Sequence, residues 1–230
     1  MFFHTHPYAP FLFKEATKLI VGTLPPPRFT QGLLKEGDVN FSYGSRDGQL
    51  WPILDRIFGL NLKYETTVDA VIQRKNFLKC RNIGICDIVA SAQREKINAS
   101  DVGMQHIQLR NLVEYLEEYT KVDTLLFTGG NSKNGPEYFF RKHLKDYQLS
   151  LTLVSDVVPR IHKFDLPTSI PMVENTGNEK VRTVRTVSLT APSGAANRAV
   201  GSLEAYKQMK AANPSFTTVD FRVMQYREFF

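Results

Sequence analysis

Residues 18–57 read KLIVGTLPPPRFTQGLLKEGDVNFSYGSRDGQLWPILDRI, and this stretch decides the class of fold. Its apolar run, residues 19–21, is closed by Gly22, Thr23 and three prolines at 25–27, a pattern typical of a buried strand that ends in a turn. Proline has no N–H and a fixed φ, so these prolines cannot extend the strand. The sequence therefore predicts that the chain leaves a parallel sheet here as a stiff loop.

A pocket is expected just beyond this loop. A polar segment that contains Phe41 and Tyr43 comes next, and Leu50, Trp51 and Leu54 then recur at helical spacing, as on a helix face that packs against a sheet. Strand, rigid loop, aromatic loop and helix is the order in which an open α/β sheet forms a pocket at its carboxyl edge.

Strands and helices are expected to alternate along the rest of the chain. Further strands are predicted at residues 83–89, 123–128 and 184–189, with another apolar run at 149–154, and helices at 66–78, 109–119, 136–144 and 195–211. Loops are expected at 90–102 and 159–184, the latter a long polar loop or insertion, and an edge strand at 217–226. The alternation predicts a three-layer α/β/α sandwich with a central, mainly parallel, four-stranded sheet. The length of 230 residues favours one domain spanning residues 1–230.

The composition is that of an ordinary soluble protein, with 42% apolar and 23% charged residues. No apolar run approaches the roughly 20 residues that span a bilayer, and the N-terminal sequence lacks the features of a signal peptide. The two cysteines, Cys80 and Cys86, provide neither a disulfide framework nor a metal quartet. A cytoplasmic protein without a membrane partner is therefore expected, and we expect it to be a monomer.

The charge balance, 29 basic minus 23 acidic residues, gives +6 and a pI near 9.3. This balance suits a polyanion such as nucleic acid, although proteins with other functions are equally basic. His4 and His6 could form half of a metal site, but no third ligand is evident, so a polar turn near the terminus is favoured. No metal and no cofactor are expected.

Polar residues follow the predicted strands, at the edge where α/β proteins bind ligands. Ser193 is placed to cap the helix expected from Ala195, where free N–H groups attract phosphate, and Arg198 adds a charge; capping alone is the alternative. Asp87, flanked by Ile85 and Ile88, needs hydrogen bonds if it is buried. Its carboxylate could contact a base edge, steer a water, or simply accept from nearby N–H groups.

Two residues in the aromatic loop have both a structural and a functional interpretation. Tyr43 could stack on a flat ligand or belong to the core, and Asp47 is interpreted as a helix cap before Trp51 rather than as a catalyst. The motifs G-x-x-x-x-G-K-[ST], G-x-G-x-x-G and G-x-S-x-G are absent, which disfavours nucleotide-phosphate loops and α/β-hydrolases.

Four segments together resemble the uracil-DNA glycosylase superfamily, most nearly its deoxyinosine (hypoxanthine) DNA glycosylase branch. Residues 20–25, IVGTLP, resemble that branch's Gly-Ser-x-Pro-Gly loop, and residues 43–51, YGSRDGQLW, resemble its tyrosine-to-tryptophan segment. Residues 84–91, GICDIVAS, resemble a strand with a Trp-Asp-Val triplet that leads to Ala-Ser, and Arg94-Glu95 continue the match. Residues 191–198, APSGAANR, are similar to the loop that wedges into the minor groove.

The resemblance implies a monofunctional DNA N-glycosylase, a hydrolase of DNA repair that needs no metal or cofactor. A deaminated base, hypoxanthine or uracil, would be turned out of the DNA into the pocket, at a cost of roughly a few kcal/mol. Tyr43 or Phe41 would stack on the base, Asp87 would face its edge, and the loop of Gly22 and Thr23 would stabilise the leaving base.

For DNA contacts, the resemblance implies that Ser193 holds a phosphate and that residues 195–198 enter the minor groove. The residues assigned to this role are Ser193, Gly194, Ala195, Asn197 and Arg198.

The sequence also departs from the family pattern. Leu24 stands where uracil enzymes have a water-activating Asp or Asn, and Ala191 stands where many have a His that stabilises the leaving base. Gly48 replaces the Asn usual in the deoxyinosine branch, and Pro26 replaces a Gly. Either Asp47 or Asp87 has then taken over catalysis, the substrate differs, or catalysis is absent. The alternatives are thus a non-catalytic nucleic-acid or base-binding protein of this fold, or an unrelated α/β enzyme acting on a small molecule.

Overall fold

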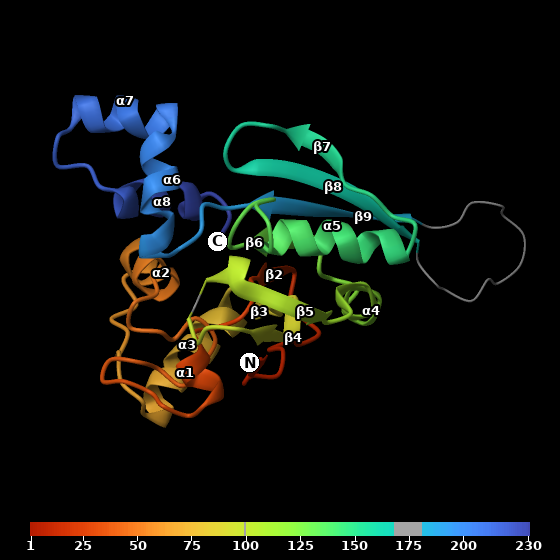
Figure 1. Ribbon diagram of the computed structural model, residues 1–230. Helices are drawn as coiled ribbons and strands as arrows, with labels where there is room; N and C mark the ends of the chain where they lie inside the picture. Colours follow the sequence, from red (N-terminus) through yellow and green to blue (C-terminus); the bar gives the residue numbers. More distant parts are fainter. Residues whose placement is uncertain (99, 168–180) are drawn as a thin grey trace, which may run out of the picture.

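A computed structural model describes residues 1–98, 100–167 and 181–230 of the chain. Its main element is a six-stranded mixed sheet (Figure 1). Its strands, in spatial order, are β3 (Ile83–Ile85), β2 (Lys18–Val21), β6 (Thr124–Phe127), β9 (Val181–Ser188), β8 (Arg160–Pro167) and β7 (Thr152–Ser155). The first four are parallel to one another, and β8 and β7 add on in antiparallel pairing. The predicted sheet of four strands was therefore too small.

Of the two additional strands, β7 falls on the apolar run at residues 149–154, whereas β8 falls in a segment predicted to be a loop. Residues 159–184 were expected to form a polar loop, but β8 buries His162, Phe164 and Leu166 while the residues between them are exposed. This alternation has the period of a strand with one covered face. The part of the expected loop at 168–180 lies outside the described residues.

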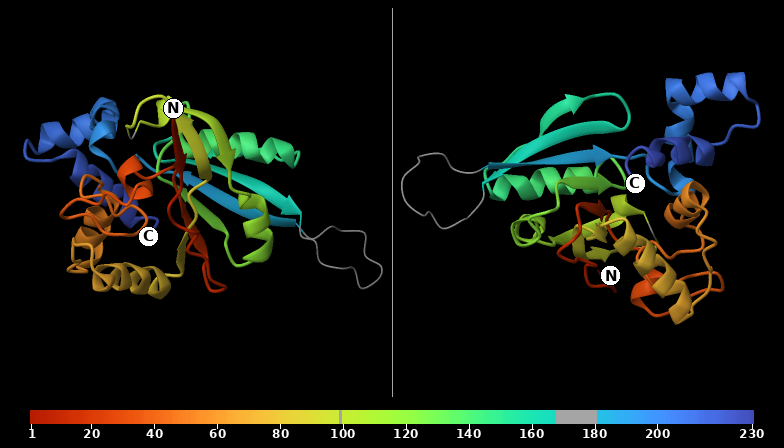
Figure 2. Two further views of the ribbon diagram at one scale, coloured as in Figure 1. Left: turned by 60° about the horizontal axis from the view of Figure 1, so that its bottom comes forward. Right: turned by 180° about the vertical axis from the view of Figure 1, so that it is seen from behind.

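A second, three-stranded antiparallel sheet is built from β1 (Phe2–Thr5), β4 (Val89–Arg94) and β5 (Met104–Leu109). Figure 2 shows the N-terminal segment beside β4, where four residue pairs are in register. The prediction of a polar turn at His4 was therefore wrong, and so was the loop at residues 90–94, because short polar strands carry little signal until they are paired. Residues 95–98 do form a loop, as predicted.

The side chains of the central strands alternate between two apolar cores. Leu19 and Val21 face a core shared with α4 (Leu112–Glu118), α5 (Pro136–Asp146) and the small sheet. Ile20 faces the other core, shared with α2 (Leu50–Phe58), α3 (Val68–Cys80) and α8 (Thr218–Arg227). Helices thus cover both faces of the sheet, as expected for a three-layer α/β/α arrangement.

The C-terminal region differs from the expectation. Residues 217–226 were predicted as an edge strand, but Thr217 and Asp220 form a capping box that starts α8. The single helix expected at 195–211 is divided into a 3₁₀ turn (Gly194–Ala196), α6 (Asn197–Ser202) and α7 (Glu204–Ala212), because Leu203 is extended. A short helix, α1 (Pro27–Thr30), begins at the third proline. Among the described residues, no helix combines the length and apolar character needed to cross a membrane.

Candidate functional site

A cavity of about 460 Å³ lies where the strands β2, β6 and β9 end, within the size range of about 300–1,000 Å³ for small-molecule sites. Its lining comes from six segments that are far apart in sequence. These are the loop after β2, the loop before α2, the ends of β3 and β6, the turn between β4 and β5, and the loop after β9. They are represented by Thr23, Leu24, Pro25, Tyr43, Asp47, Asp87, Asp101, Thr128, Ala191, Ser193, Gly194 and Ala195. The structure thus brings Tyr43, Asp87 and Ser193 to one hollow.

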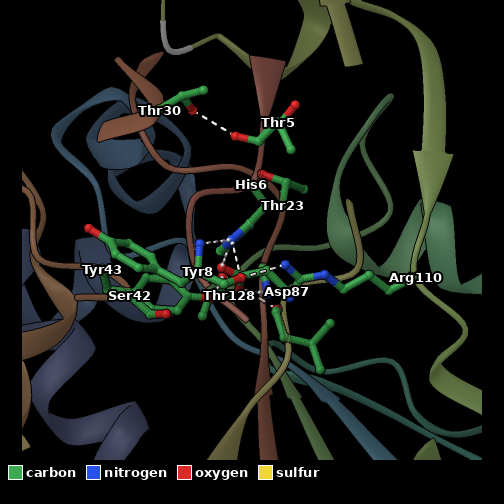
Figure 3. Close-up of polar contacts among 12 residues, drawn as sticks. Thr5, His6, Tyr8, Thr23, Thr30, Ser42, Tyr43, Asp87, Arg110 and Thr128 are labelled. Atoms are coloured by element: carbon green, nitrogen blue, oxygen red, sulfur yellow. Dashed lines mark hydrogen bonds and ion pairs between the residues drawn. The ribbon is translucent and has the colours of Figure 1, made fainter. Parts of the chain in front are cut away.

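Asp87 is buried two residues beyond the end of β3 and accepts hydrogen bonds from three elements (Figure 3). Its Oδ1 accepts from the backbone N–H of Gly22 at 2.7 Å and from the hydroxyl of Tyr43 at 2.6 Å. Its Oδ2 lies 2.9 Å from Nε2 of His6. These bonds satisfy the buried carboxylate, so Asp87 is in place to hold the wall of the cavity together.

Tyr43 is the group through which this network reaches the cavity. Burial and the nearby Asp87 carboxylate raise the pKa of Tyr43 well above its usual value. The phenol therefore stays protonated, and its O–H donates a hydrogen bond to Asp87. The backbone of Tyr43 is left-handed, with φ of 59°, a conformation that is uncommon for a residue with a side chain.

Gly22 lets Tyr43 and Asp87 approach the end of β2. A Cβ at this position would lie 2.2 Å from the Tyr43 hydroxyl and 2.9 Å from Oδ1 of Asp87. The N–H of Gly22 is used by Asp87 and does not point to a ligand. In the described part of the chain, the N–H groups of Thr23 and Leu24 have no hydrogen-bond partner, so these are the donors that the loop offers.

His6 is a member of the site that the sequence did not reveal. Its Nδ1 lies 3.2 Å from the N–H and 2.9 Å from the carbonyl oxygen of Tyr8. The imidazole ring thus connects Asp87 through Nε2 to the backbone of Tyr8 through Nδ1. The only signal was the polar character of the terminus, because the partner Asp87 is 81 residues away.

Asp47 lines the cavity. The sequence predicted that Asp47 caps α2, but it does not. The N-cap is Gln49, without a side-chain cap bond, and Asp47 lies 3.3 Å from Nη2 of Arg28 with 69% of its side chain exposed. The same guanidinium makes two bonds of 2.8 Å to buried Asp38 and donates to Ser45. Arg28 therefore fixes this side of the cavity.

Phe41 does not line the cavity. Its buried ring packs against Phe11 and Trp51, with centroid distances of 6.1 and 6.2 Å. The expectation that Phe41 stacks on a ligand therefore conflicts with its position in the core, and Tyr43 is the aromatic residue at the site.

The loop after β9 is held on its protein side by Arg222, a fully buried residue of α8. Its guanidinium donates to the carbonyl oxygens of Ala191 and Ser193 and to the side chains of Gln49 and Asn197. Asn197 is thereby turned toward the protein, which conflicts with its expected role in binding DNA.

The expected cap at Ser193 is also absent, because its side chain makes no cap hydrogen bond. Gly194, Ala195 and Arg198 are exposed. The Gly194 N–H lies in an isolated antiparallel bridge between Gly48 and Ser193. Among the described residues, the N–H group of Ala195 has no partner, so the loop presents a hydroxyl and one free donor at the rim of the cavity.

Asp101 is a second residue that the sequence analysis did not select. It begins a 3₁₀ turn (Asp101–Gly103) between β4 and β5 and lines the cavity. Its Oδ1 accepts from the Thr23 hydroxyl at 2.9 Å. Burial raises the pKa of Asp101 to about 6, although the Thr23 hydrogen bond and the charge of Arg94 act in the opposite direction. In the part of the chain that is described, no three His, Cys, Asp or Glu side chains come together as a metal-binding group.

Comparison with known proteins supports the fold. No protein-family model matches the chain, and no curated protein matches it. Among solved structures, the chain is similar to the solution NMR structure of a protein from Methanosarcina acetivorans, which is described provisionally as a uracil DNA glycosylase. The two share 17% sequence identity with a TM-score of 0.50, and the match covers 91% of this chain and 96% of the other. The chain therefore has a fold like that of this solved protein.

Proposed function

We propose that this protein is a monofunctional DNA glycosylase that hydrolyses the N-glycosidic bond of a deaminated base, hypoxanthine or uracil. The observation that supports this most is the cavity at the carboxyl edge of the sheet, which combines an aromatic ring, free backbone donors and polar side chains. The glycosylase-like fold and the four matching sequence segments point the same way.

In this proposal, a base turned out of the DNA stacks on Tyr43. The free N–H groups of Thr23 and Leu24 donate to the base as negative charge develops on it, in the manner of an oxyanion hole. The deoxyinosine branch is favoured by the segment from Tyr43 to Trp51, which resembles that branch.

Asp87 is proposed to act by positioning. Its oxygens already accept from Gly22, Tyr43 and His6, so it holds the stacking ring and the donor loop in register and has little capacity for a direct bond to the base. Asp47, exposed and paired with Arg28, belongs to the cavity rim.

The loop after β9 is the proposed DNA contact. The hydroxyl of Ser193 and the N–H group of Ala195 are free to bind a phosphate, as backbone donors do in anion sites. Arg198 is exposed and adds a positive charge. Asn197 contributes indirectly, by accepting from Arg222.

The test is a panel of single-stranded and duplex oligonucleotides that each contain one uracil, hypoxanthine or xanthine. After incubation with the protein, alkali cleaves any abasic site that base release has left. We expect cleavage at one or more of the lesions and none in the undamaged control strand. Intact strands for every lesion would refute the proposal.

A non-catalytic, base-binding protein of the same fold is the second candidate. It is favoured by Leu24 and Ala191, apolar residues that line the cavity where related enzymes were expected to have an acid or amide and a histidine. Binding to lesion-bearing duplex that weakens steeply with salt, without any abasic product, would support this candidate.

A further inference from the structure

Three carboxylates line the cavity, and they differ in what their oxygens contact. Asp87 accepts three hydrogen bonds, and Asp47 is a largely exposed partner of Arg28. Asp101 accepts one, from the Thr23 hydroxyl to Oδ1. Within residues 1–98, 100–167 and 181–230, no donor bonds its Oδ2, so this oxygen remains available inside a partly enclosed site.

Hydrogen bonds from two buried side chains hold the backbone around Asp101. The side-chain amide of buried Asn134 donates to the carbonyl oxygens of Asp101, at 2.9 Å, and Met104, at 3.2 Å. Buried Arg94 donates to the carbonyl oxygen of Ser100, the preceding residue. The carboxylate is therefore presented by a braced turn, as pre-organised catalytic groups are.

We propose that Asp101 is the general base of the reaction, activating the water that attacks the sugar. The inference rests on the proposed glycosylase function. The C1′–N bond breaks with its electron pair passing to the base, and the water oxygen forms the new C1′–O bond. Oδ2 of Asp101 takes the water proton, and the departing base takes up a proton from solvent. Asp101 would thus supply the water-activating side chain that Leu24 cannot provide.

The electrostatic surroundings suit that role. The charged groups that face Asp101 are Arg94 from β4 and Asp87 from the segment after β3, and the polar partner is Thr23 after β2. Burial, the largest influence, raises the pKa of Asp101 to about 6. A general base is most efficient when its pKa lies near the working pH.

The direct test is single-turnover base release by Asp101→Asn, with enzyme in excess over the lesion-bearing oligonucleotide. General base catalysis contributes about 10²–10⁴-fold, so we expect a rate reduction of that order while affinity for the oligonucleotide stays within about threefold. The matched control is Glu95→Gln, which neutralises an exposed carboxylate of the same segment and is expected to retain the wild-type rate. An Asp101→Asn rate within threefold of wild type would overturn the assignment.

The pH dependence of the wild-type rate provides a test that does not depend on folding of a variant. We expect the rate to fall about tenfold per pH unit below pH 6, because the protonated carboxyl cannot accept a proton. Thr23→Val removes a hydrogen bond that lowers the pKa of Asp101 and should move this inflection upward, while Thr23→Ser should not. A flat profile from pH 5 to 8 would overturn the inference.

The two proposals fail in different ways. If the wild-type protein releases no base from any lesion, the glycosylase proposal and this inference both fall. If it releases base and Asp101→Asn is equally fast, only the role of Asp101 is wrong.

Discussion

The hydroxyl of Tyr43 lies 2.6 Å from Oδ1 of Asp87, and the backbone N–H of Gly22 donates to the same oxygen at 2.7 Å. One carboxylate oxygen thus joins the loop before α2 to the ends of β2 and β3. Hydrogen bonds to an ionised acceptor are stronger than neutral ones, so this junction sets the shape of the cavity before any ligand enters.

Removing the Tyr43 hydroxyl should weaken the junction. We expect Tyr43→Phe to lower the free energy of unfolding by about 1–3 kcal/mol, because buried Asp87 loses one donor. Tyr147→Phe is the control, since its hydroxyl bonds Asn111 at an exposed site, and should change stability by less than about 0.5 kcal/mol. Urea unfolding of both variants measures the difference, and equal stabilities would show that the bond contributes nothing.

A methyl group at Gly22 should disturb the same junction sterically. The new Cβ would lie 2.2 Å from the Tyr43 hydroxyl and 2.9 Å from Oγ1 of Thr128, so one of these groups must move. We expect Gly22→Ala to cost about 1–3 kcal/mol of folding stability, as overpacking does. Gly201→Ala, where nothing lies within 4 Å of the added Cβ, should be neutral or stabilising in the same thermal or urea measurements.

Arg222 should control the order of the loop after β9. A lysine has one nitrogen and cannot reproduce the planar guanidinium that donates to Ala191, Ser193 and Asn197. We expect Arg222→Lys to cost about 1–3 kcal/mol and to speed proteolytic cleavage between residues 191 and 198. Exposed Arg227→Lys should match wild type, and an unchanged cleavage rate in Arg222→Lys would contradict this account.

Asp38 should make stability depend on acid pH. Although burial raises the pKa of its carboxyl, hydrogen bonds from Arg28 and from the N–H groups of Arg46 and Lys35 lower it to about 2. Since the folded pKa lies below the unfolded value of about 3.9, the stabilisation is complete above pH 4 and is lost as pH falls toward 2.

The matching variant is Asp38→Asn, which leaves Arg28 without its buried partner and should cost about 3 kcal/mol near neutral pH. Between pH 4 and 2, the free energy of unfolding measured in urea should also fall less steeply for Asp38→Asn than for the wild type. Asp69→Asn, with 72% of the Asp69 side chain exposed, is the control and should keep the wild-type slope. A wild-type slope in Asp38→Asn would assign the acid sensitivity to other carboxylates.

Local patterns in the sequence were sufficient for the parallel strands and their polar ends. The apolar run before Gly22 forms β2 as predicted, and the strand predicted at residues 83–89 is divided between the end of β3 at Ile85 and the start of β4 at Val89. Strand and helix periodicity and Gly–Pro stops are properties of neighbouring residues, so they can be recognised without the fold. β8 and α8 were missed although both carry local signals, since Phe164 and Leu166 alternate with charged residues and Thr217 and Asp220 have the spacing of a capping box.

The sequence by itself thus determined that polar loops meet at the carboxyl edge of an α/β sheet. Only the tertiary structure decided which side chains share the cavity and which serve as supports. His6 pairs with Asp87 81 residues away, and Arg222 bonds Gln49 across 173 residues. The physical reason is that a buried polar group must find partners in space, and sequence spacing does not specify which distant donors will be near.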